Sequence, residues 1–316
     1  MKNLILGIDL GGTKSAASLL TETGQMIYRE AGPTPAQESP SVIVSFLADL
    51  AQTILARKSS GDRIVGMGIS AGAPADGRRG VVFAAPNMPG WGEAGFPLGE
   101  RLAAHLGLSL PTALENDADA TALAEHRFGA GQGTENMAFL TVGTGVGAGL
   151  IIDGKLLRGV FGAGGEVGHI CVEPEGRVCA CGLRGCLEAY ASGPSLVRIA
   201  AEAGYAGEQA GAGVAAAARA GDLSALFAVQ TAGRMLGRGI ATLAMLLNPE
   251  VIVLGTLAVH AGDLLLPEIE REMRLRTWPR LRQSLRIVPA ALGDRAQDLA
   301  ALCAFLHQYP AILSGE

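Results

Sequence analysis

The chain has 316 residues, a formal net charge of -5 and 49% hydrophobic residues. This length is typical of two domains or one large one, and the hydrophobic fraction is sufficient for a buried core. The acidic balance argues against nucleic acid or an anionic membrane as a partner, because both favour a basic face. Small molecules are therefore the expected partners.

No membrane span or export signal is expected. The longest uncharged run, 136–152, is interrupted by four glycines, which suit a spanning helix of about 20 apolar residues poorly. The N-terminal Met1-Lys2 leads straight into LILGIDLGGTK, without a separate apolar segment or cleavage site. We expect a cytoplasmic protein, in which Cys171 and Cys303 are buried and reduced.

The first predicted element is a β-hairpin. Two apolar runs, Leu4–Leu10 and Ser15–Leu20, flank Gly11-Gly12-Thr13-Lys14. The backbone N–H groups of such a turn can face an anion, Thr13 adds a hydroxyl, and Asp9 can hold Mg²⁺ through water. The turn matches neither a Walker loop nor a dinucleotide fingerprint. A phosphate-binding turn and a plain glycine hairpin are the two interpretations.

A helix over Ser41–Arg57 and a buried strand over Ile64–Ile69 follow. The strand runs into the small-residue loop Ser70–Pro74, which includes Gly72. A short strand over Gly80–Phe83 precedes the segment PNMPGW, which carries Asn87. An amide and an aromatic side chain after a strand suit contact with a sugar. A turn held by two prolines is an equal alternative.

The segment Glu115-Asn116-Asp117-Ala118-Asp119 opens an alanine-rich helix that ends near Phe128. A helix over Leu98–Leu106 and a short strand before Glu115 precede it. Asparagine and aspartate at a helix start commonly cap it, and this interpretation competes well for Asp119. For Asp117 we prefer a catalytic role.

The segment Asn136–Ile152 repeats the plan of the N-terminus, with a strand, the turn Gly143-Thr144-Gly145 and a second strand. A dinucleotide-binding interpretation fails because a hairpin at Asp153-Gly154 follows instead of a helix. The repetition predicts two related halves, each with a phosphate-binding turn. Two such turns facing one another would hold a nucleoside triphosphate between domains.

The stretch Glu166–Glu188 contains a candidate metal site. One imidazole and three thiols, the donor set that tetrahedral Zn²⁺ prefers, come from His169, Cys179, Cys181 and Cys186. Four protein ligands leave no open position, so the metal would be structural and would orient the flanking glutamates. The alternative is a group of ordinary buried cysteines. A thioredoxin-like redox role is weaker, because only one residue separates Cys179 from Cys181.

The remaining elements are mostly helical. Two or three helices are expected over Ala189–Ala232, and a longer one over Thr231–Leu247 ends before a proline. The buried strand Val251–Leu254 precedes Gly255-Thr256, where a flat ligand such as adenine can approach the backbone. A strand over 287–289 and a helix over 298–306 complete the chain.

Five segments together resemble one family. They are GIDLGGTK at 7–14, ENDAD at 115–119, GTGVGAG at 143–149, EVGH at 166–169 and CACGLRGCLE at 179–188. In this order they resemble the ROK family of sugar kinases and sugar-responsive repressors. The pairing of E-x-G-H with C-x-C-G-x-x-G-C-x-E is the part most specific to that family.

The resemblance implies an α/β fold of the actin-like, hexokinase-like (ribonuclease H-like) type, with two domains around a central cleft and a structural zinc loop. The small domain is expected over 1–115 with the C-terminal helix at 298–316, and the large domain, with the zinc loop and a dimer surface, over 116–297. Assembly as a homodimer, or as a tetramer, is also implied.

The resemblance also implies a role for each candidate residue. Asp117 would be the general base that takes a proton from the sugar hydroxyl. The expected sugar contacts are Gly72, Asn87, Asn116, Asp117, Glu166, His169 and Glu188. The expected contacts to ATP and its Mg²⁺ are Asp9, Gly11, Gly12, Thr13, Lys14, Thr144, Gly145, Gly255 and Thr256. The expected zinc ligands are His169, Cys179, Cys181 and Cys186.

Two departures from the family pattern bear on the nucleotide. Gly255-Thr256 stands where the family often has Gly-Gly, and Ala296-Gln297-Asp298 stands where it tends to have Ala-Gly-Leu. Both lie where adenosine is expected to bind, so they put the nucleotide preference in question.

The expected activity is ATP-dependent phosphorylation of the 6-hydroxyl of a hexose. Glucose is the first choice because PNMPGW resembles glucokinase-like members of the family. N-acetylmannosamine, N-acetylglucosamine, fructose and mannose are the alternative sugars. A sugar-sensing regulator is the alternative from another class, but a first strand at Leu4 leaves no room for DNA-binding helices. A non-catalytic sugar-binding protein would not need Asp117.

Overall fold

The structure is a computed structural model that describes residues 2–84, 89–92 and 94–312. The chain forms two compact units. Unit 1 consists of Met1–Arg127, Arg158–Gly164 and Leu292–Glu316, and unit 2 of Phe128–Leu157 and Gly165–Ala291. These limits differ from the predicted domains, 1–115 with 298–316 and 116–297, chiefly because the helix that begins at Asp117 lies in unit 1.

Unit 1 is built on a five-stranded mixed sheet in the order β3-β2-β1-β4-β7. Its strands are β1 (Asn3–Leu10), β2 (Lys14–Leu20), β3 (Met26–Pro33), β4 (Arg63–Ala71) and β7 (Thr112–Asn116). β1, β2 and β3 run antiparallel, whereas β4 and β7 run parallel to β1. The predicted hairpin over 4–20 is confirmed as β1 and β2. β3 was not predicted, because its side chains are mostly half-buried and show no apolar alternation.

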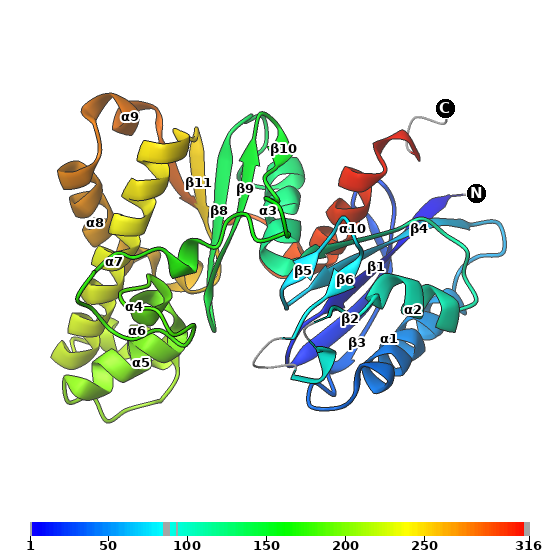
Figure 1. Cartoon of the computed structure of the whole chain (residues 1–316), viewed down its shortest axis with the longest axis horizontal. Helices are drawn as coiled ribbons and strands as arrows, with labels where there is room; N and C mark the ends of the chain where they lie inside the picture. The colour runs from blue at the N-terminus through cyan, green and yellow to red at the C-terminus, as the bar shows by residue number, and fades with distance from the viewer. Residues whose placement is uncertain (1, 85–88, 93, 313–316) are drawn as a thin grey trace. The chain divides into compact units, whose positions relative to one another are not determined.

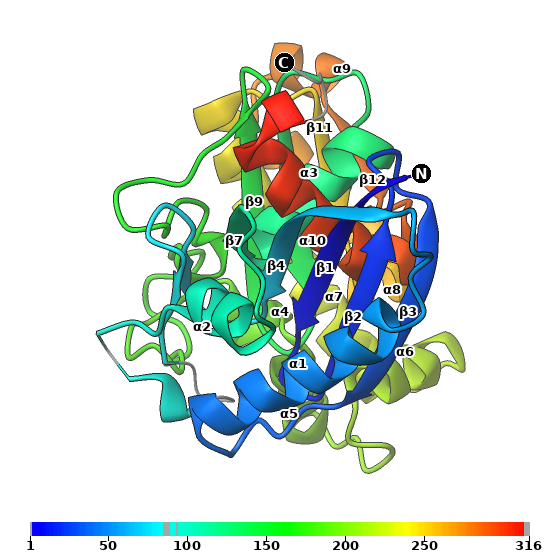
Figure 2. The same cartoon turned by 90° about the vertical axis from the view of Figure 1, so that its right-hand side faces the viewer.

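Helices cover both faces of this sheet (Figures 1 and 2). α1 (Pro40–Leu55) and α2 (Leu98–His105) lie on one face, and α10 (Ala296–Gln308) lies on the other. α3 (Asp117–Phe128) follows β7, and a two-stranded sheet is formed by β5 (Ala75–Asp76) and β6 (Val81–Val82). The short 3₁₀ helices of unit 1 are η1 (Pro89–Trp91), η3 (Gly293–Arg295) and η4 (Pro310–Ile312).

Glycines let α10 lie directly on the strands beneath it. A Cβ atom on Gly68 would lie 1.9 Å from the carbonyl oxygen of Ala301, and one on Gly66 would lie 2.0 Å from the ring of Phe305. The opposite face of β1 carries the fully buried side chains of Leu4, Leu6, Ile8 and Leu10, which belong to the core that includes α1. Glycines on one face of β4 and large apolar side chains on the opposite face of β1 thus form two different helix-packing faces of the sheet.

Unit 2 has a second five-stranded sheet in the order β10-β9-β8-β11-β12. Its strands are β8 (Met137–Val142), β9 (Val146–Ile152), β10 (Lys155–Leu156), β11 (Val251–Leu254) and β12 (Arg286–Pro289). β8, β9 and β10 run antiparallel, and β11 and β12 run parallel to β8. The strand order and directions repeat those of unit 1, so the predicted structural repeat is confirmed.

The described part of unit 2 contains the α-helices α4 (Glu188–Ala191), α5 (Gly193–Glu202), α6 (Gly211–Arg219), α7 (Leu223–Leu247), α8 (Leu257–Arg276) and α9 (Pro279–Ser284). It also contains the 3₁₀ helix η2 (Val167–His169). α7 and α8 approach closely because α7 offers glycines. A Cβ atom on Gly237 would lie 2.7 Å from Cβ of Glu272 and 3.0 Å from the backbone of Ile269.

Three helices differ from the prediction, because α7 begins earlier and neither α8 nor α9 was predicted. α7 begins at Leu223 and not at Thr231, because the carboxylate of Asp222 caps it by accepting a hydrogen bond from the Ala225 N–H at 2.8 Å. α8 was not predicted. It contains Pro267 and a non-helical residue, Ala261, so its sequence lacks one continuous helical pattern.

Among the described residues, no single helix is both long and apolar enough to cross a membrane. The pair α6 and α7, bent by 114°, meets the length and composition criteria only when its two helices are taken together.

We predict that Gly68→Ala destabilises unit 1 by about 3 kcal/mol, because the new methyl group would overlap the backbone of α10. Calorimetric unfolding of purified protein measures the effect. Gly61→Ala is the matched control, since no atom lies within 4 Å of a Cβ at this exposed position. A Gly68→Ala protein as stable as the Gly61→Ala protein would contradict the packing described for α10.

Candidate active site

Three segments predicted to act together meet at one edge of the sheet in unit 1. β1, β4 and β7 are parallel, so their carboxyl ends lie side by side. Asp9 is paired with Ser70, and Ala71 is paired with Asn116. Ligands of open α/β sheets commonly bind at this edge.

The glycine turn between β1 and β2 is tight. A Cβ atom on Gly11 would lie 2.5 Å from the carbonyl oxygen of Lys14, so a side chain at this position would clash. Gly12 lies in the same turn and is partly buried, while Thr13 and Lys14 are exposed. The exposed turn can therefore contact an anion, as its residue types predict.

Gly72 lies between this turn and Asp117. Its N–H donates to the carbonyl oxygen of Leu10 at 2.8 Å. A Cβ atom on Gly72 would lie 3.7 Å from both Oδ2 of Asp117 and Cα of Gly11. A glycine at this position leaves space beside the Asp117 carboxylate, and unit 1 brings the predicted residues Gly11, Gly72 and Asp117 together.

Asn116 fixes the junction between β7 and α3. Its side-chain Nδ2 donates to the carbonyl oxygen of Ala73 at 3.1 Å, and its Oδ1 accepts from the N–H of Ala118 at 2.9 Å. The second contact is a helix cap, so the capping interpretation of Asn116 is confirmed. Asp117 is the first residue of α3 and follows this anchored amide directly.

The Asp117 side chain is exposed, so a substrate can reach it. The protein atoms around the Asp117 carboxylate shield it from much of the solvent, and this desolvation raises its pKa above the ordinary aspartate value. Hydrogen bonds with the backbone N–H groups of Ala118 and Asp117 and with the Asn116 side chain partly offset the rise. A carboxylate with a raised pKa accepts a proton more readily than an ordinary aspartate.

Asp9 is a second carboxylate near Asp117, and it is only 7% exposed. Burial, followed by the charges of Asp117 and Asp298, raises the pKa of Asp9 to about 7, and Arg29 opposes the rise. Asp298 is itself 2% exposed and accepts from Nε of Arg29 at 2.9 Å and 3.2 Å. Three carboxylates with one arginine make this part of unit 1 favourable for a cation, which fits a Mg²⁺ ion held near Asp9.

Unit 2 brings its own glycine turn next to Gly255-Thr256. The hydroxyl groups of Thr141 and Thr256 lie 2.8 Å apart, and a Cβ atom on Gly143 would lie 3.4 Å from Thr256. Thr144 and Thr256 are exposed. The two predicted nucleotide segments of unit 2 are therefore adjacent.

Thr256 has a backbone conformation that suits glycine. Its φ of 54° and ψ of -115° are unusual for a residue with a side chain and cost of order 1–3 kcal/mol. Strain of this kind is concentrated at ligand sites. The backbone of Thr256 thus has a conformation that glycine would adopt at lower cost.

A cavity of about 320 Å³ lies at the carboxyl ends of β11 and β12. Leu254, Val288 and Pro289 contribute apolar walls. Arg219 and Asp263, whose Nε and Oδ2 lie 2.9 Å apart, contribute a charged pair. The volume is at the lower end of small-molecule sites, and the walls suit a flat apolar ring.

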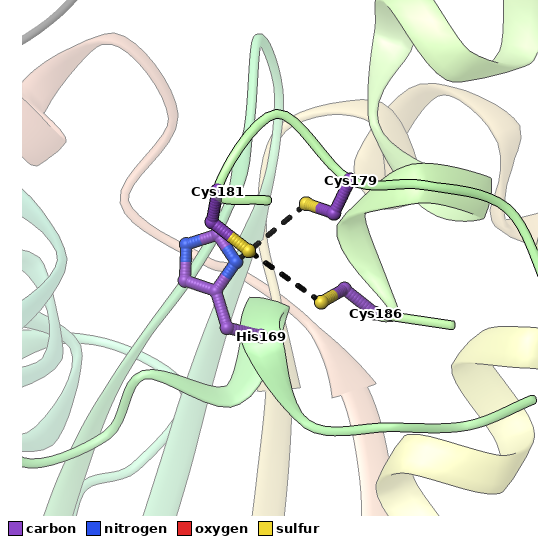
Figure 3. A group of neighbouring side chains, drawn as sticks. All are labelled: His169, Cys179, Cys181 and Cys186. Atoms are coloured by element: carbon purple, nitrogen blue, oxygen red, sulfur yellow. Dashed lines mark hydrogen bonds between the residues drawn. The ribbon is translucent and has the colours of Figure 1, made fainter. Parts of the chain in front are cut away.

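The four predicted metal ligands come together in unit 2, as Figure 3 shows. One candidate ligand atom from each of His169, Cys179, Cys181 and Cys186 lies within 4.8 Å of the others. Sγ of Cys181 is 3.7 Å from Sγ of Cys186, and Sγ of Cys179 is 3.8 Å from Nδ1 of His169. Tetrahedral coordination with zinc–sulfur bonds of about 2.3 Å requires sulfur atoms about 3.8 Å apart. The donor set therefore fits zinc in both chemistry and spacing.

The loop that carries the cysteines turns at two glycines, as predicted. Gly182 has φ of 89° and Gly185 has φ of 73°. A Cβ atom on Gly185 would lie 1.9 Å from the carbonyl oxygen of Glu173. Burial, followed by the neighbouring thiols, raises the pKa of Cys186 to about 12, so a cation is needed to stabilise thiolates here.

The two predicted glutamates flank the cluster differently. Glu166 is exposed, and its Oε2 lies 4.0 Å from Nε2 of His169, the ring nitrogen that faces away from the cysteines. Glu188 accepts a hydrogen bond from the N–H of Val146 at 2.9 Å, and its Oε1 lies 4.0 Å from Sγ of Cys179. Glu188 thus links the cysteine cluster to the glycine turn of unit 2.

One predicted site residue has no described position, and one buried arginine near the site was not predicted. Asn87, predicted to contact the sugar, lies outside the described residues. Arg158 was not singled out from the sequence, although it contacts Glu115, two residues before Asp117. The signal available was a glutamate directly after a predicted strand, because a carboxylate that is buried there needs a cation.

A model of the ROK family matches residues 5–307. The chain is 36% identical over 310 residues to a glucokinase from Streptomyces coelicolor, and the alignment covers 93% of this chain and 94% of that protein.

Solved structures are similar over almost the whole chain. The crystal structure of a ROK hexokinase from Thermus thermophilus has a TM-score of 0.83 and 37% identity, covering 98% of this chain and 100% of that one. A ROK family glucokinase from Streptomyces griseus, in complex with glucose and AMPPNP, has a TM-score of 0.77 and 35% identity, covering 95% of this chain and 98% of that one.

Proposed function

Because the chain belongs to the ROK family, we propose that it is an ATP-dependent glucokinase that transfers the γ-phosphoryl group to the 6-hydroxyl of glucose. The similarity to glucokinases over more than nine-tenths of the chain supports the reaction. The observation that carries the proposal is the exposed carboxylate of Asp117, with the space at Gly72 beside it.

Asp117 is the proposed general base. Its carboxylate takes the proton from the attacking sugar hydroxyl, and its raised pKa favours this transfer. General base catalysis contributes about 10²–10⁴ in rate, so positioning and charge stabilisation of the phosphates supply the rest. Asn116 keeps Asp117 in place by anchoring the strand end before it.

The two glycine turns are the proposed phosphate sites. Unit 1 contributes Asp9 and the turn from Gly11 to Lys14, and unit 2 contributes Thr144, Gly145, Gly255 and Thr256. Mg²⁺, when bound with ATP near Asp9, supplies positive charge to the phosphate oxygens. The cavity beside β11 and β12 is the proposed adenine site, because Leu254, Val288 and Pro289 give it apolar walls and Leu254 directly precedes Gly255.

The proposed sugar contacts beyond Asp117 are Gly72, Asn87, Asn116, Glu166, His169 and Glu188. Zinc in the cysteine cluster is proposed to be structural, since four protein ligands fill a tetrahedral site. It would hold His169 with Nδ1 toward the metal and Nε2 toward the sugar. The zinc therefore orients a sugar contact and takes no part in the chemistry.

Assembly as a homodimer and a cytoplasmic location stay predictions from the sequence. The described part of unit 2 exposes Leu246, Leu275 and Trp278 at 68–74% of their surface, and apolar residues of this size are common at interfaces. Light scattering that gives the mass of one chain at assay concentration would contradict the dimer.

We predict that the purified protein forms ADP from MgATP and glucose, and that Asp117→Asn lowers kcat by at least about 100-fold while glucose still binds. A coupled assay measures ADP formation and kcat with glucose, N-acetylmannosamine, N-acetylglucosamine, fructose and mannose. Calorimetric titration measures the binding of glucose to Asp117→Asn. If ADP forms with another of these sugars but not with glucose, that sugar replaces glucose as the proposed substrate. No ADP with any of the sugars would contradict the kinase.

We predict about one zinc per chain in protein purified without chelators, because the cluster offers a complete ligand set. Cys181→Ser is expected to lose the zinc and to unfold at a lower temperature, since metal binding contributes to folding. The matched control is Cys171→Ser, because Cys171, which was expected to be buried, is exposed like Cys181 but is not in the cluster. Elemental analysis that finds no zinc in the wild type would refute the site.

A further inference from the structure

One short segment of unit 1, Arg158–Gly164, is flanked on both sides by residues of unit 2 in the sequence. Two glycines fix its path. Gly159 and Gly162 have φ of 68° and 73°, and a Cβ atom on Gly162 would lie 2.3 Å from the carbonyl oxygen of Ala75. The segment is therefore packed directly against β5, with no room for a side chain at Gly162.

Arg158, at the start of this segment, forms a forked ion pair with Glu115. Nε of Arg158 lies 3.0 Å from Oε1 and 3.3 Å from Oε2 of Glu115, and Nη2 also contacts Oε1. The Glu115 side chain is 2% exposed and that of Arg158 is 17% exposed. A buried, forked pair of this kind is directional and holds both groups in one geometry.

The other groups around Glu115 make this arginine necessary. A Cβ atom on Gly77 would lie 2.7 Å from Oε2 of Glu115, so the β5–β6 hairpin closes over the carboxylate. Burial raises the pKa of Glu115, the hydrogen bonds and charge of Arg158 lower it, and Asp76 raises it further. Arg158 is thus the group that compensates a carboxylate crowded by a second acid.

His307, on α10, completes the surroundings of Arg158. Its Nε2 lies 3.3 Å from Nη1 of Arg158. Burial, followed by the charges of Arg158 and His126, lowers the pKa of His307 to about 4, so the ring is neutral at neutral pH and can accept from the guanidinium. The guanidinium is therefore held from two directions, by Glu115 and by His307.

Glu115 connects this arrangement to the proposed catalytic residue. It is the last residue but one of β7, and Asp117 follows two residues later. Asn116 ties the same strand end to Ala73 and caps α3 through Ala118. The junction before Asp117 is thus fixed by one neutral anchor, Asn116, and one charged anchor, the pair of Glu115 with Arg158.

We propose that Arg158 is a positioning residue for the phosphoryl transfer: by holding Glu115 it fixes the strand-to-helix junction and so the position of the Asp117 carboxylate. This inference rests on the proposed function, because it takes Asp117 as the general base. It predicts that Arg158 acts on turnover more than on substrate affinity, since Arg158 reaches the reaction only through Glu115.

The test compares Arg158→Met, Glu115→Gln and the double variant Glu115→Gln/Arg158→Met. Arg158→Met is expected to lose about 10- to 100-fold in kcat, with little change in the KM for glucose, because a small displacement of a catalytic group costs this much. Its unfolding temperature should also fall, since a buried carboxylate is left without its partner. The double variant removes both charges, so its unfolding temperature should recover while its kcat stays low.

Recovery of kcat together with stability in the double variant would overturn the proposal, because the pair would then serve stability alone. Wild-type kcat in Arg158→Met would also overturn it. If Arg158→Met fails to fold, the double variant carries the test. Failure of the proposed function is distinguishable, since the wild type itself would then form no ADP with any sugar.

The matched control is an exposed arginine–glutamate pair of the same unit. Nη2 of Arg57 lies 3.5 Å from Oε2 of Glu30, with side chains 53% and 36% exposed. Arg57→Met and Glu30→Gln/Arg57→Met are expected to keep the wild-type kcat and unfolding temperature, because exposed pairs contribute little. If these variants lost as much kcat as Arg158→Met, the effect would not be specific to Arg158, and the proposal would be wrong.

Discussion

The parallel pairing of β1, β4 and β7 is the constraint on which the proposed catalytic site in unit 1 depends. It brings Asp9, Ser70 and Asn116 to one edge of the sheet, although more than 40 residues separate each segment from the next. Glycines at 11 and 72 keep this edge open beside Asp117. Burial raises the pKa of Asp9 and of Asp117, and the neighbouring carboxylates add to the rise at Asp9, which makes this edge suitable for a cation and for proton transfer.

In unit 2 the corresponding link is Glu188. It accepts from the backbone of the glycine turn at Val146 and lies beside Cys179 of the cysteine cluster. A cation bound by the cluster would therefore fix the turn as well as His169. The cluster and the nucleotide segments, which are separate motifs in the sequence, are parts of one connected arrangement in unit 2.

The sequence predicted the features that depend on local pattern. Both hairpins, the strands β4 and β11, the helix at Asp117 and the four-residue cluster agree with the structure. β3 and α8 were missed for physical reasons. β3 lies at the sheet edge with half-buried side chains, and α8 is interrupted at Ala261 and contains Pro267.

The contacts of Arg158, Asp298 and Glu188 could not be predicted, because each joins residues that are far apart in the sequence. Arg158 contacts Glu115 across 43 positions and Asp298 contacts Arg29 across 269. An arginine in a glycine-rich loop has no spacing that marks it as buried. Only the fold shows that it compensates a carboxylate next to the proposed base.

The pH dependence of kcat tests the central claim, that Asp117 is the base, most directly. The raised pKa means that Asp117 becomes protonated, and unable to accept a proton, at a higher pH than an ordinary aspartate. We expect the wild-type kcat to fall as the pH is lowered, with a midpoint above the ordinary aspartate pKa, and the residual rate of Asp117→Asn to lack this fall. The same acid limb in Asp117→Asn would contradict the account.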